Sequence, residues 1–248
     1  MATLRAKVEN IREGERELEQ TTSHYLLRVL RLAVGDSFVG FDPHSKMEAR
    51  AELVRADNGK AVARFEKPTA ANVVAPFDVW WIHSLAKGDK VDAIVRDATE
   101  LGATHILLAR TARSVVKLDD DKSDKKRQRW QTIADEAARQ CGRSDPPTIA
   151  GPFAWEEALS LPPPDAAKFL LYEGASAPLA HSLRRALDAG QPLAFCAGPE
   201  GGLTDEEVNS AVARGYENVS LGKFILRTET VSAAVLGAVR IFAEKSPK

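Results

Sequence analysis

The sequence has few of the residues that disulfide frameworks and metal centres require. Its 248 residues include only two cysteines, Cys141 and Cys196, and five scattered histidines. No His, Cys or carboxylate cluster has a metal-ligand spacing, so we expect no metal site and no metal-dependent hydrolysis. Two cysteines do not form a disulfide framework either, which is typical of a reducing, cytoplasmic setting.

Long hydrophobic runs, an excess of one charge and several catalytic motifs are also absent. No apolar run is long enough to span a bilayer, and the first twenty residues lack the apolar core of a signal peptide, so we expect no membrane partner. The 34 basic and 35 acidic residues nearly cancel, so any nucleic-acid-binding surface must be local. The phosphate loop of ATPases, the G-x-G-x-x-G turn and the G-x-S-x-G nucleophile turn are missing, which disfavours ATP hydrolysis and serine-type catalysis.

The spacing of the short apolar runs predicts two domains. Residues 1–68 contain strand candidates at 37–41, 49–54 and 61–65, too few for a sandwich, and these predict a small β-barrel. Residues 67–76 carry two prolines and no clear period, as a linker does. Strands and helices then alternate over residues 77–248, which predicts an α/β fold with a mostly parallel sheet.

The elements expected in the second domain follow one another regularly. The strand candidates are 79–82, 105–108, 169–172, 193–197 and 219–221. The helix candidates are 90–101, 125–141, 155–161, 179–189, 205–213 and 231–243. Each predicted strand therefore ends in a loop that leads to a helix, the arrangement of a sheet covered by helices.

The most informative stretch is 193–237. Its first predicted strand ends at Gly198-Pro199-Glu200-Gly201-Gly202, where glycines permit positive φ and close approach of a ligand. Thr204 and Glu207 have the spacing of a capping box, and Gly215 is a plausible end for that helix. A second strand end followed by a glycine comes at 219–222. Because ligands of open α/β sheets bind beyond the carboxyl ends of the strands, these two turns predict a ligand site.

Several blocks of the chain together resemble one protein family. They are GPEGGLTDEEV, LGKFILRTETVSAAVLGAV, HYLLRVLRLAVGD, KGDKVDAIVRDATELGATHI and RWQTIADEAARQCGRSDPP. These blocks are similar to those of the RsmE family, in the order of that family, and they span most of the chain. RsmE proteins are ribosomal RNA methyltransferases of the knotted SPOUT superfamily, which use S-adenosyl-L-methionine.

This resemblance implies a fold, a reaction and an assembly. The fold is a SPOUT-type domain with a C-terminal trefoil knot, preceded by a PUA-like RNA-binding β-barrel. The reaction is methylation at N3 of a uridine in 16S ribosomal RNA of the small ribosomal subunit. The assembly is a homodimer that completes each active site across a two-fold interface, and the small residues of 231–243 would permit close helix packing. A SPOUT enzyme acting on transfer RNA or on another position, and a non-catalytic RNA-binding homologue, are the alternatives.

The resemblance also implies which residues hold the methyl donor. Three loops contribute Leu171, Tyr172, Glu173, Gly198, Pro199, Glu200, Gly201, Leu221, Gly222, Ile225, Leu226, Arg227 and Thr230. In this interpretation Glu173 and Glu200 lie near the ribose or the amino-acid end, and backbone groups of the last loop hold the adenine. The structural alternative is that the glycines only close tight turns. One position departs from the family, because Phe224 stands where members commonly carry an arginine.

Arg227 and Glu229 are the catalytic candidates. N3 of uracil is a weakly acidic imide, which attacks well only after its proton has left. A guanidinium such as that of Arg227 would stabilise the developing anion, and a carboxylate such as that of Glu229 would position the arginine or take the proton. The structural alternative is an ion pair between these two residues at the start of a helix.

Basic residues in three places are the RNA-binding candidates. Arg28 lies in a predicted helix, 24–30, with Ser23 as its cap, and Arg31 directly follows that helix. Lys87 opens one of the family-like blocks, and Lys125 and Arg129 lie in the charged run 119–130. The structural alternative for each group is a solvated, amphipathic or charged helix surface.

Overall fold

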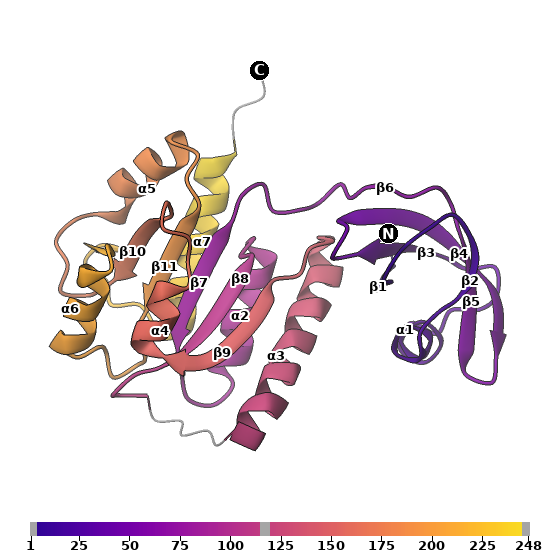
Figure 1. Cartoon of the computed structure of the whole chain (residues 1–248), viewed down its shortest axis with the longest axis horizontal. Helices are drawn as coiled ribbons and strands as arrows, with labels where there is room; N and C mark the ends of the chain where they lie inside the picture. The colour runs from indigo at the N-terminus through magenta and orange to yellow at the C-terminus, as the bar shows by residue number, and fades with distance from the viewer. Residues whose placement is uncertain (1–3, 115–119, 245–248) are drawn as a thin grey trace. The chain divides into compact units, whose positions relative to one another are not determined.

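The computed structural model describes residues 4–114 and 120–244, and its contacts divide the chain into two compact units (Figure 1). The first unit comprises 1–74 with 138–146, and the second comprises 75–137 and 147–248. The boundary near residue 74 falls inside the predicted linker, whereas 138–146 lies within the range predicted for the second domain. Asp119, the first residue of the predicted charged run, lies outside the described residues.

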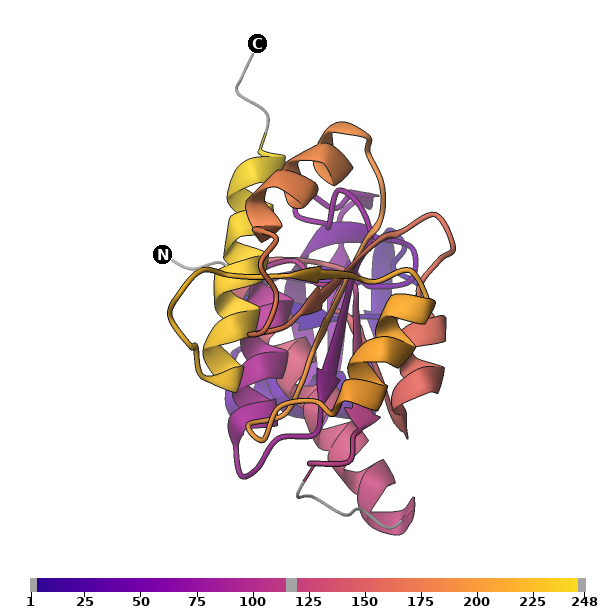
Figure 2. The ribbon, with the colours of Figure 1, turned by 90° about the vertical axis from the view of Figure 1, so that its left-hand side faces the viewer.

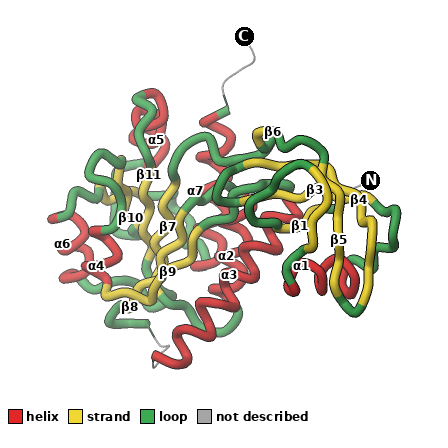
Figure 3. Tube along the Cα trace, turned by 45° about the vertical axis from the view of Figure 1, so that its right-hand side comes forward, coloured by secondary structure: helices red, strands yellow, loops and turns green. Residues whose placement is uncertain are grey.

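The first unit is built around a six-stranded sheet. Its strand order is β1 (Arg5–Lys7), β3 (Ser37–Asp42), β4 (Met47–Asp57), β5 (Lys60–Phe65) and β2 (Gly14–Glu17), with β6 (Thr69–Ala70) paired to β4. The long strands β4 and β5 form a hairpin (Figure 3) that turns at Asn58 and Gly59, both at positive φ, as such two-residue turns require. Phe38 and Phe65 meet edge to face in the core, 6.0 Å apart. The predicted linker therefore contributes a strand.

The helix predicted to begin after Ser23 begins earlier. Helix α1 spans Gln20–His24 and continues as a π-helical turn, η1 (Tyr25–Val29). Ser23 is not its cap, because its buried hydroxyl donates to Leu18 O at 3.1 Å and accepts from Ala61 N at 3.1 Å. This serine fastens the helix to β5. Arg28 and Arg31 are both exposed.

The second unit contains a parallel sheet. Its strand order is β12 (Glu217–Val219), β10 (Ala167–Leu171), β11 (Leu193–Ala197), β7 (Val79–Ser84), β8 (His105–Arg110) and β9 (Thr148–Ala154), and all neighbours run parallel. The predicted parallel α/β fold is confirmed. Strand β9 was not predicted, because Gly151 and Pro152 interrupt its apolar pattern.

Helices cover both faces of this sheet. Successive strand residues point to opposite faces, so Trp81 and Ile82 belong to different clusters of the core. The cluster of Trp81 includes side chains of α2 (Lys90–Glu100), α3 (Asp120–Cys141), α5 (Leu179–Asp188) and α7 (Thr228–Ala243). The cluster of Ile82 includes side chains of α4 (Trp155–Ser160) and α6 (Asp205–Ala213). Figure 2 shows α7 and α6 on opposite sides of the sheet.

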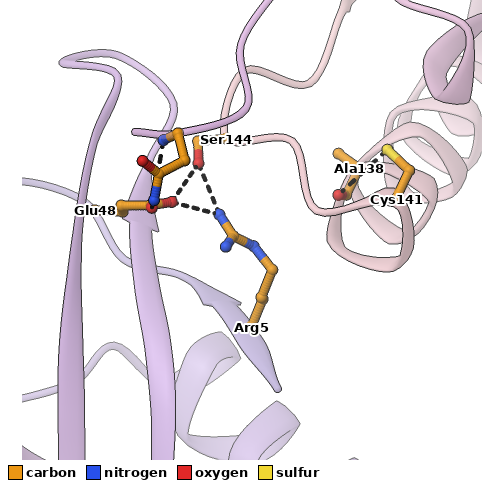
Figure 4. A network of polar contacts seen from close by, with 6 residues as sticks. Arg5, Glu48, Ala138, Cys141 and Ser144 are labelled. Carbon is orange, nitrogen blue, oxygen red and sulfur yellow. Dashed lines mark hydrogen bonds and ion pairs between the residues drawn. The ribbon is translucent and has the colours of Figure 1, made fainter. Parts of the chain in front are cut away.

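The segment after α3 is tied to the first unit through Glu48. Arg5 Nη2 donates to Glu48 Oε2 at 2.8 Å and to Ser144 Oγ at 2.7 Å, and Ser144 Oγ donates to Glu48 Oε2 at 3.1 Å (Figure 4). Asn72 Nδ2 donates to the other carboxylate oxygen at 2.9 Å. Burial opposes ionisation of Glu48, but these hydrogen bonds hold its pKa below the ordinary value. This network explains why 138–146 belongs with residues far away in the sequence.

The described residues contain neither a candidate membrane span nor a candidate metal-binding cluster. Within 4–114 and 120–244 no helix has the length and hydropathy of a membrane span. The same residues include no group of three or more His, Cys, Asp or Glu side chains arranged to hold a metal ion.

Candidate functional site

A pocket of about 910 Å³ opens beyond the carboxyl ends of β10, β11 and β12. Three loops line it, one after each strand, together with Thr228 and Val231 of α7. The first and third loops are joined, because Ser220 N donates to Ala177 O at 2.8 Å and Leu179 N donates to Ser220 O at 3.0 Å. The strand order therefore brings together three segments that are separate in the sequence.

Most residues that the resemblance assigned to the donor line this pocket. They are Leu171, Tyr172, Glu173, Gly198, Pro199, Leu221, Gly222, Ile225 and Leu226. Glu200, Gly201, Arg227 and Thr230 are not among the lining residues but are next to them in the chain, and Glu229 likewise lies in the first turn of α7. Sequence reasoning missed Gly174, Ala175, Ser176, Pro178 and Ser220 among the lining residues. Their position just after strand ends is the signal that could have found them.

The loop 198–203, hereafter the glycine loop, is anchored at its end by Glu207. Glu207 Oε2 accepts from Thr204 N at 2.9 Å, and Thr204 Oγ1 accepts from Glu207 N at 3.3 Å, which confirms the predicted capping box. Glu207 Oε1 accepts from Ala112 N at 2.7 Å, and Trp155 Nε1 donates to Glu207 O at 3.0 Å. This carboxylate thus joins the loop after β8 to the start of α6.

The glycines of this loop serve two different needs. Gly202 has a φ of +73°, as a turn in the left-handed region requires. Gly198 and Gly201 have ordinary φ values but are tightly packed, because an added Cβ would lie 2.9 Å from Leu203 Cγ and 3.1 Å from Arg113 Cβ, respectively. The expectation of positive φ is therefore correct for one glycine, and close packing accounts for the other two.

Arg113 follows β8 and contacts the glycine loop from outside the pocket lining. Its Nη1 donates to Gly201 O at 2.9 Å and to Leu203 O at 3.3 Å. The sequence carried no signal for this contact, because the two segments are almost ninety residues apart and meet only through the strand order. Lys90 is a second residue that sequence reasoning missed.

Lys90 lies between two carboxylates beside the pocket. Its Nζ is 2.9 Å from Glu200 Oε1 and 3.8 Å from Glu229 Oε2. The hydrogen bond to Glu200 raises the pKa of Lys90, and the same bond holds the pKa of Glu200 below its usual range although burial opposes this. An ion pair between Arg227 and Glu229, which was the structural alternative to their catalytic roles, is not present among the described residues, where Glu229 Oε2 lies toward Lys90 instead.

His83 is buried at the carboxyl end of β7, near this charged cluster. Its Nδ1 lies 2.7 Å from Ser84 O, and its Nε2 has no hydrogen-bond partner among the described residues. Burial lowers the pKa of His83, although the backbone of Ser84 and Thr228 and the charges of two glutamates act in the opposite direction. The ring is therefore neutral near pH 7.

The loop 220–227, hereafter the exposed loop, presents apolar side chains to solvent. Phe224 is 88% exposed and Ile225 is 84% exposed, although both line the pocket. Gly222 has a φ of +109°, and its N–H donates to Ser220 Oγ at 3.1 Å. Two neighbouring apolar side chains at this exposure mark a surface that a ligand or another chain can cover.

The basic candidates in the second unit are engaged to different degrees. Arg129 Nη2 lies 2.5 Å from Asp92 Oδ2, and Trp130 Nε1 donates to the other oxygen of Asp92 at 3.0 Å. Arg129 is therefore ion-paired with α2, and its contact with an RNA phosphate stays a prediction. Lys125 is exposed, and the backbone N–H of Lys87 donates to Glu200 Oε1 at 3.3 Å while its side chain is exposed.

Comparisons with known proteins identify relatives of the whole chain. Residues 74–240 match the RNA methyltransferase domain family. The chain is 34% identical to the ribosomal RNA small subunit methyltransferase E of Bacillus subtilis, over 87% of this chain and 86% of the relative. The crystal structure of the enzyme of that name from Neisseria gonorrhoeae, bound to S-adenosyl methionine, has a TM-score of 0.87 at 28% identity over 96% of this chain and 97% of that one. A methyltransferase from Legionella pneumophila, also with bound S-adenosyl methionine, has a TM-score of 0.88 at 25% identity over 97% and 98%.

Proposed function

This chain belongs to the ribosomal RNA small subunit methyltransferase E family, and we therefore propose that it methylates N3 of a uridine in 16S ribosomal RNA with S-adenosyl-L-methionine. The observation that carries this proposal is the pocket beyond three parallel strand ends in a fold shared with two structures that hold this donor. Because the proposed substrate is ribosomal RNA, we assign the protein to the cytoplasm.

The pocket residues suit such a donor. Gly198 and Gly222 line the pocket, and because glycine has no side chain of its own, an adenine and a ribose can approach the backbone at these turns. The Glu173 carboxylate lines the pocket and attracts the positively charged amino-acid end. When bound, the donor supplies a methyl group that its sulfonium has already activated. The protein's contribution is then to hold the methyl group and the uracil nitrogen in line.

The charged residues beside the pocket suit an imide acceptor. Arg227 has no ion-pair partner among the described residues, so its guanidinium is available to a uracil carbonyl oxygen as negative charge develops. Oε2 of Glu229 is buried toward Lys90, which leaves Oε1 to accept the N3 proton. Lys90 thus holds the carboxylate in place without Arg227.

We assign the finer features of the fold and assembly to the same family. The first unit is proposed as a PUA-like RNA-binding barrel, and the segment after β12 as part of a trefoil knot. Support for the knot comes from the path of the chain after β12. Ser220 hydrogen-bonds to the backbone of residues 177 and 179, and the chain then continues into α7, which packs against α2. A crystal structure contradicts that assignment if its backbone trace contains no knot when the two ends of the chain are pulled apart. The exposed loop supports the homodimer, since Phe224 and Ile225 need a cover.

The deciding experiment uses 16S ribosomal RNA from a bacterial strain that lacks its own enzyme of this family. Purified protein with S-adenosyl-L-methionine should add one methyl group, which mass spectrometry of the digested RNA identifies as 3-methyluridine. Calorimetry of the same protein should show donor binding without added metal. Methylation of transfer RNA, or of another position, favours the first alternative. Binding of RNA with no donor affinity favours a non-catalytic homologue.

The RNA-binding role of the first unit has a separate test. Replacing Arg28 and Arg31 by Ala removes two exposed guanidinium groups and should lower the salt slope of RNA binding by about one to two, without changing donor affinity. The matched control removes the same charge from exposed Arg12 and Arg55 of the same unit. An equal loss in both variants contradicts a specific role for Arg28 and Arg31.

A further inference from the structure

We infer that Arg113 is a positioning residue for the methyl donor, which acts by holding the glycine loop in its binding conformation. The inference rests on the proposed function, because it assigns the pocket to the donor. Arg113 itself is exposed and lies outside the pocket lining. Its effect must therefore pass through the residues that it contacts.

The guanidinium of Arg113 bridges the tightest turn of the glycine loop. Its Nη1 reaches Gly201 O at 2.9 Å and Leu203 O at 3.3 Å, the carbonyl oxygens on either side of Gly202. Gly202 adopts a φ of +73°, and its N–H donates to Pro199 O at 2.9 Å, so the chain reverses there. A single charged donor thus holds the two carbonyl oxygens that flank Gly202.

The neighbouring residue provides a second anchor of the same loop. Ala112 N donates to Glu207 Oε1 at 2.7 Å, and Glu207 caps the helix that begins directly after the glycine loop. Adjacent residues after β8 thus hold the middle of the loop and its exit. Strand β8 does not end at the pocket, so these contacts form an outer support of the pocket wall rather than part of its lining.

The same guanidinium lies next to an acidic residue of the pocket. A Cβ placed on Gly202 would be 3.6 Å from Arg113 Nη1 and 3.8 Å from Glu173 Oε1, so both charged groups approach one side of this glycine. Gly202 and Glu173 line the pocket. The loop after β10 and the glycine loop therefore meet at the point that Arg113 supports, and no side chain other than hydrogen fits at residue 202 without strain.

These contacts predict an effect on donor affinity rather than on turnover. Without Arg113 the reversal at Gly202 loses its charged donor, and donor binding must then order a loop that the protein alone no longer orders. The chemistry takes place at the methyl group and the uracil nitrogen, and Arg113 is not placed to contact either. A donor at saturating concentration should therefore restore most of the rate.

The test compares Arg113→Ala and Arg113→Lys with Arg110→Ala, which removes an exposed arginine at the end of the same strand. Calorimetry should show donor affinity about tenfold weaker in Arg113→Ala, with kcat at saturating donor within about threefold of wild type. Hydrogen exchange at 201–203 should be faster in the donor-free variant. Arg113→Lys should recover part of the affinity, because an ammonium group can reach one carbonyl oxygen but lacks the planar fork.

Each other result overturns the inference. If Arg113→Ala binds the donor as tightly as Arg110→Ala does, Arg113 is not a positioning residue, even if hydrogen exchange at 201–203 is faster. A lower kcat with unchanged donor affinity makes Arg113 a residue of the reacting centre instead. If wild type binds no donor, the proposed function fails and the inference fails with it, whereas normal wild-type binding with an unaffected variant contradicts the inference alone.

Discussion

The glycine loop and the exposed loop line the same pocket, but the protein holds them differently. The glycine loop is supported by side chains from elsewhere in the second unit, with Arg113 on its carbonyl oxygens and Glu207 at its exit. The exposed loop has a short internal turn at Ser220 and Gly222, followed by apolar side chains in solvent. One wall of the pocket is thus supported within the chain, and the other wall has a face that only a ligand or a second chain can cover.

This difference indicates what each wall contributes. A loop fixed by charged hydrogen bonds is ordered before the donor arrives, so it sets the shape of the donor site. A loop with an uncovered apolar face can gain order when RNA or the proposed second subunit covers it. Arg227 lies at the end of the exposed loop, so the proposed catalytic guanidinium belongs to the wall that depends more on its partners.

The largest expected effect concerns Arg227. Arg227→Ala should lower single-turnover methylation of small-subunit particles by about 10²–10³-fold, the scale for removing one donor to a developing anion. Donor affinity should change much less, because the contact strengthens only in the transition state. Arg227→Lys keeps the charge but not the planar fork, so it should remain impaired. Equal losses of donor affinity and rate would instead make Arg227 part of the donor site.

The second effect is the removal of the Glu207 carboxylate from the supported wall. Glu207→Ala leaves the N–H groups of Ala112 and Thr204 without their acceptor and should lower the free energy of unfolding by about 2 kcal/mol. Urea unfolding monitored by circular dichroism measures this change. Asn209→Ala, at an exposed position of the same helix, is the control. A Glu207→Ala protein as stable as that control contradicts the support described for this wall.

The third effect tests the cover of the exposed wall. Phe224→Ser and Ala234→Glu each change an exposed residue on the proposed dimer face, and each should weaken dimerisation about tenfold or more. Val212→Glu, on the exposed surface of α6, should leave the dimer intact. Light scattering distinguishes the dimer from a 27.0 kDa monomer. A wild-type monomer at micromolar concentration, or a monomeric variant with full activity, contradicts a shared site.

The smallest effect concerns His83, which lies near the charged residues beside both walls. Its folded pKa is lower than the unfolded value of about 6.5, so its contribution to stability is complete above pH 6.5 and is lost as pH falls toward the folded pKa. Between pH 7 and 5 the free energy of unfolding should fall by up to about 1.4 kcal/mol per pH unit from this residue.

His83→Asn keeps a donor near Ser84 O but does not titrate, so the slope should become smaller. It should not vanish, because burial also lowers the pKa of His105. The lowered pKa values of Glu200 and Glu48 act at more acidic pH and do not enter this window. An unchanged slope in His83→Asn contradicts the buried neutral ring.

Local signals predicted the elements well where both ends of an element carried a marker. Helix α6 has its predicted bounds, because Thr204 and Glu207 mark its start and Gly215 its end. Helix α7 starts three residues before the predicted position, since its N-cap is Arg227, a residue type without capping preference. Strands β1, β2 and β6 are too short for a periodic pattern to reveal them.

The candidate site was predictable where it follows strand ends and not where it depends on strand order. The pocket-lining residues Gly198 and Gly222 come directly after predicted strands, so the sequence itself pointed to them. Lys90 and Arg113 reach the glycine loop only because β11, β7 and β8 are neighbours in the sheet. No periodicity in a single sequence encodes that order, so their roles became visible only in the structure.

The network around Glu48 has a consequence for how the first unit forms during synthesis. Arg5 and Glu48 leave the ribosome early, but Ser144, which hydrogen-bonds to both, is made almost a hundred residues after Glu48. Domains generally fold as units while the chain is still growing, yet this one is not a continuous stretch of chain. In a nascent chain that ends near residue 74, the Glu48 carboxylate and the Arg5 guanidinium therefore lack the Ser144 hydroxyl as a hydrogen-bond partner. The N-terminal unit reaches its final form only after strands β7 and β8 of the other unit have already been made.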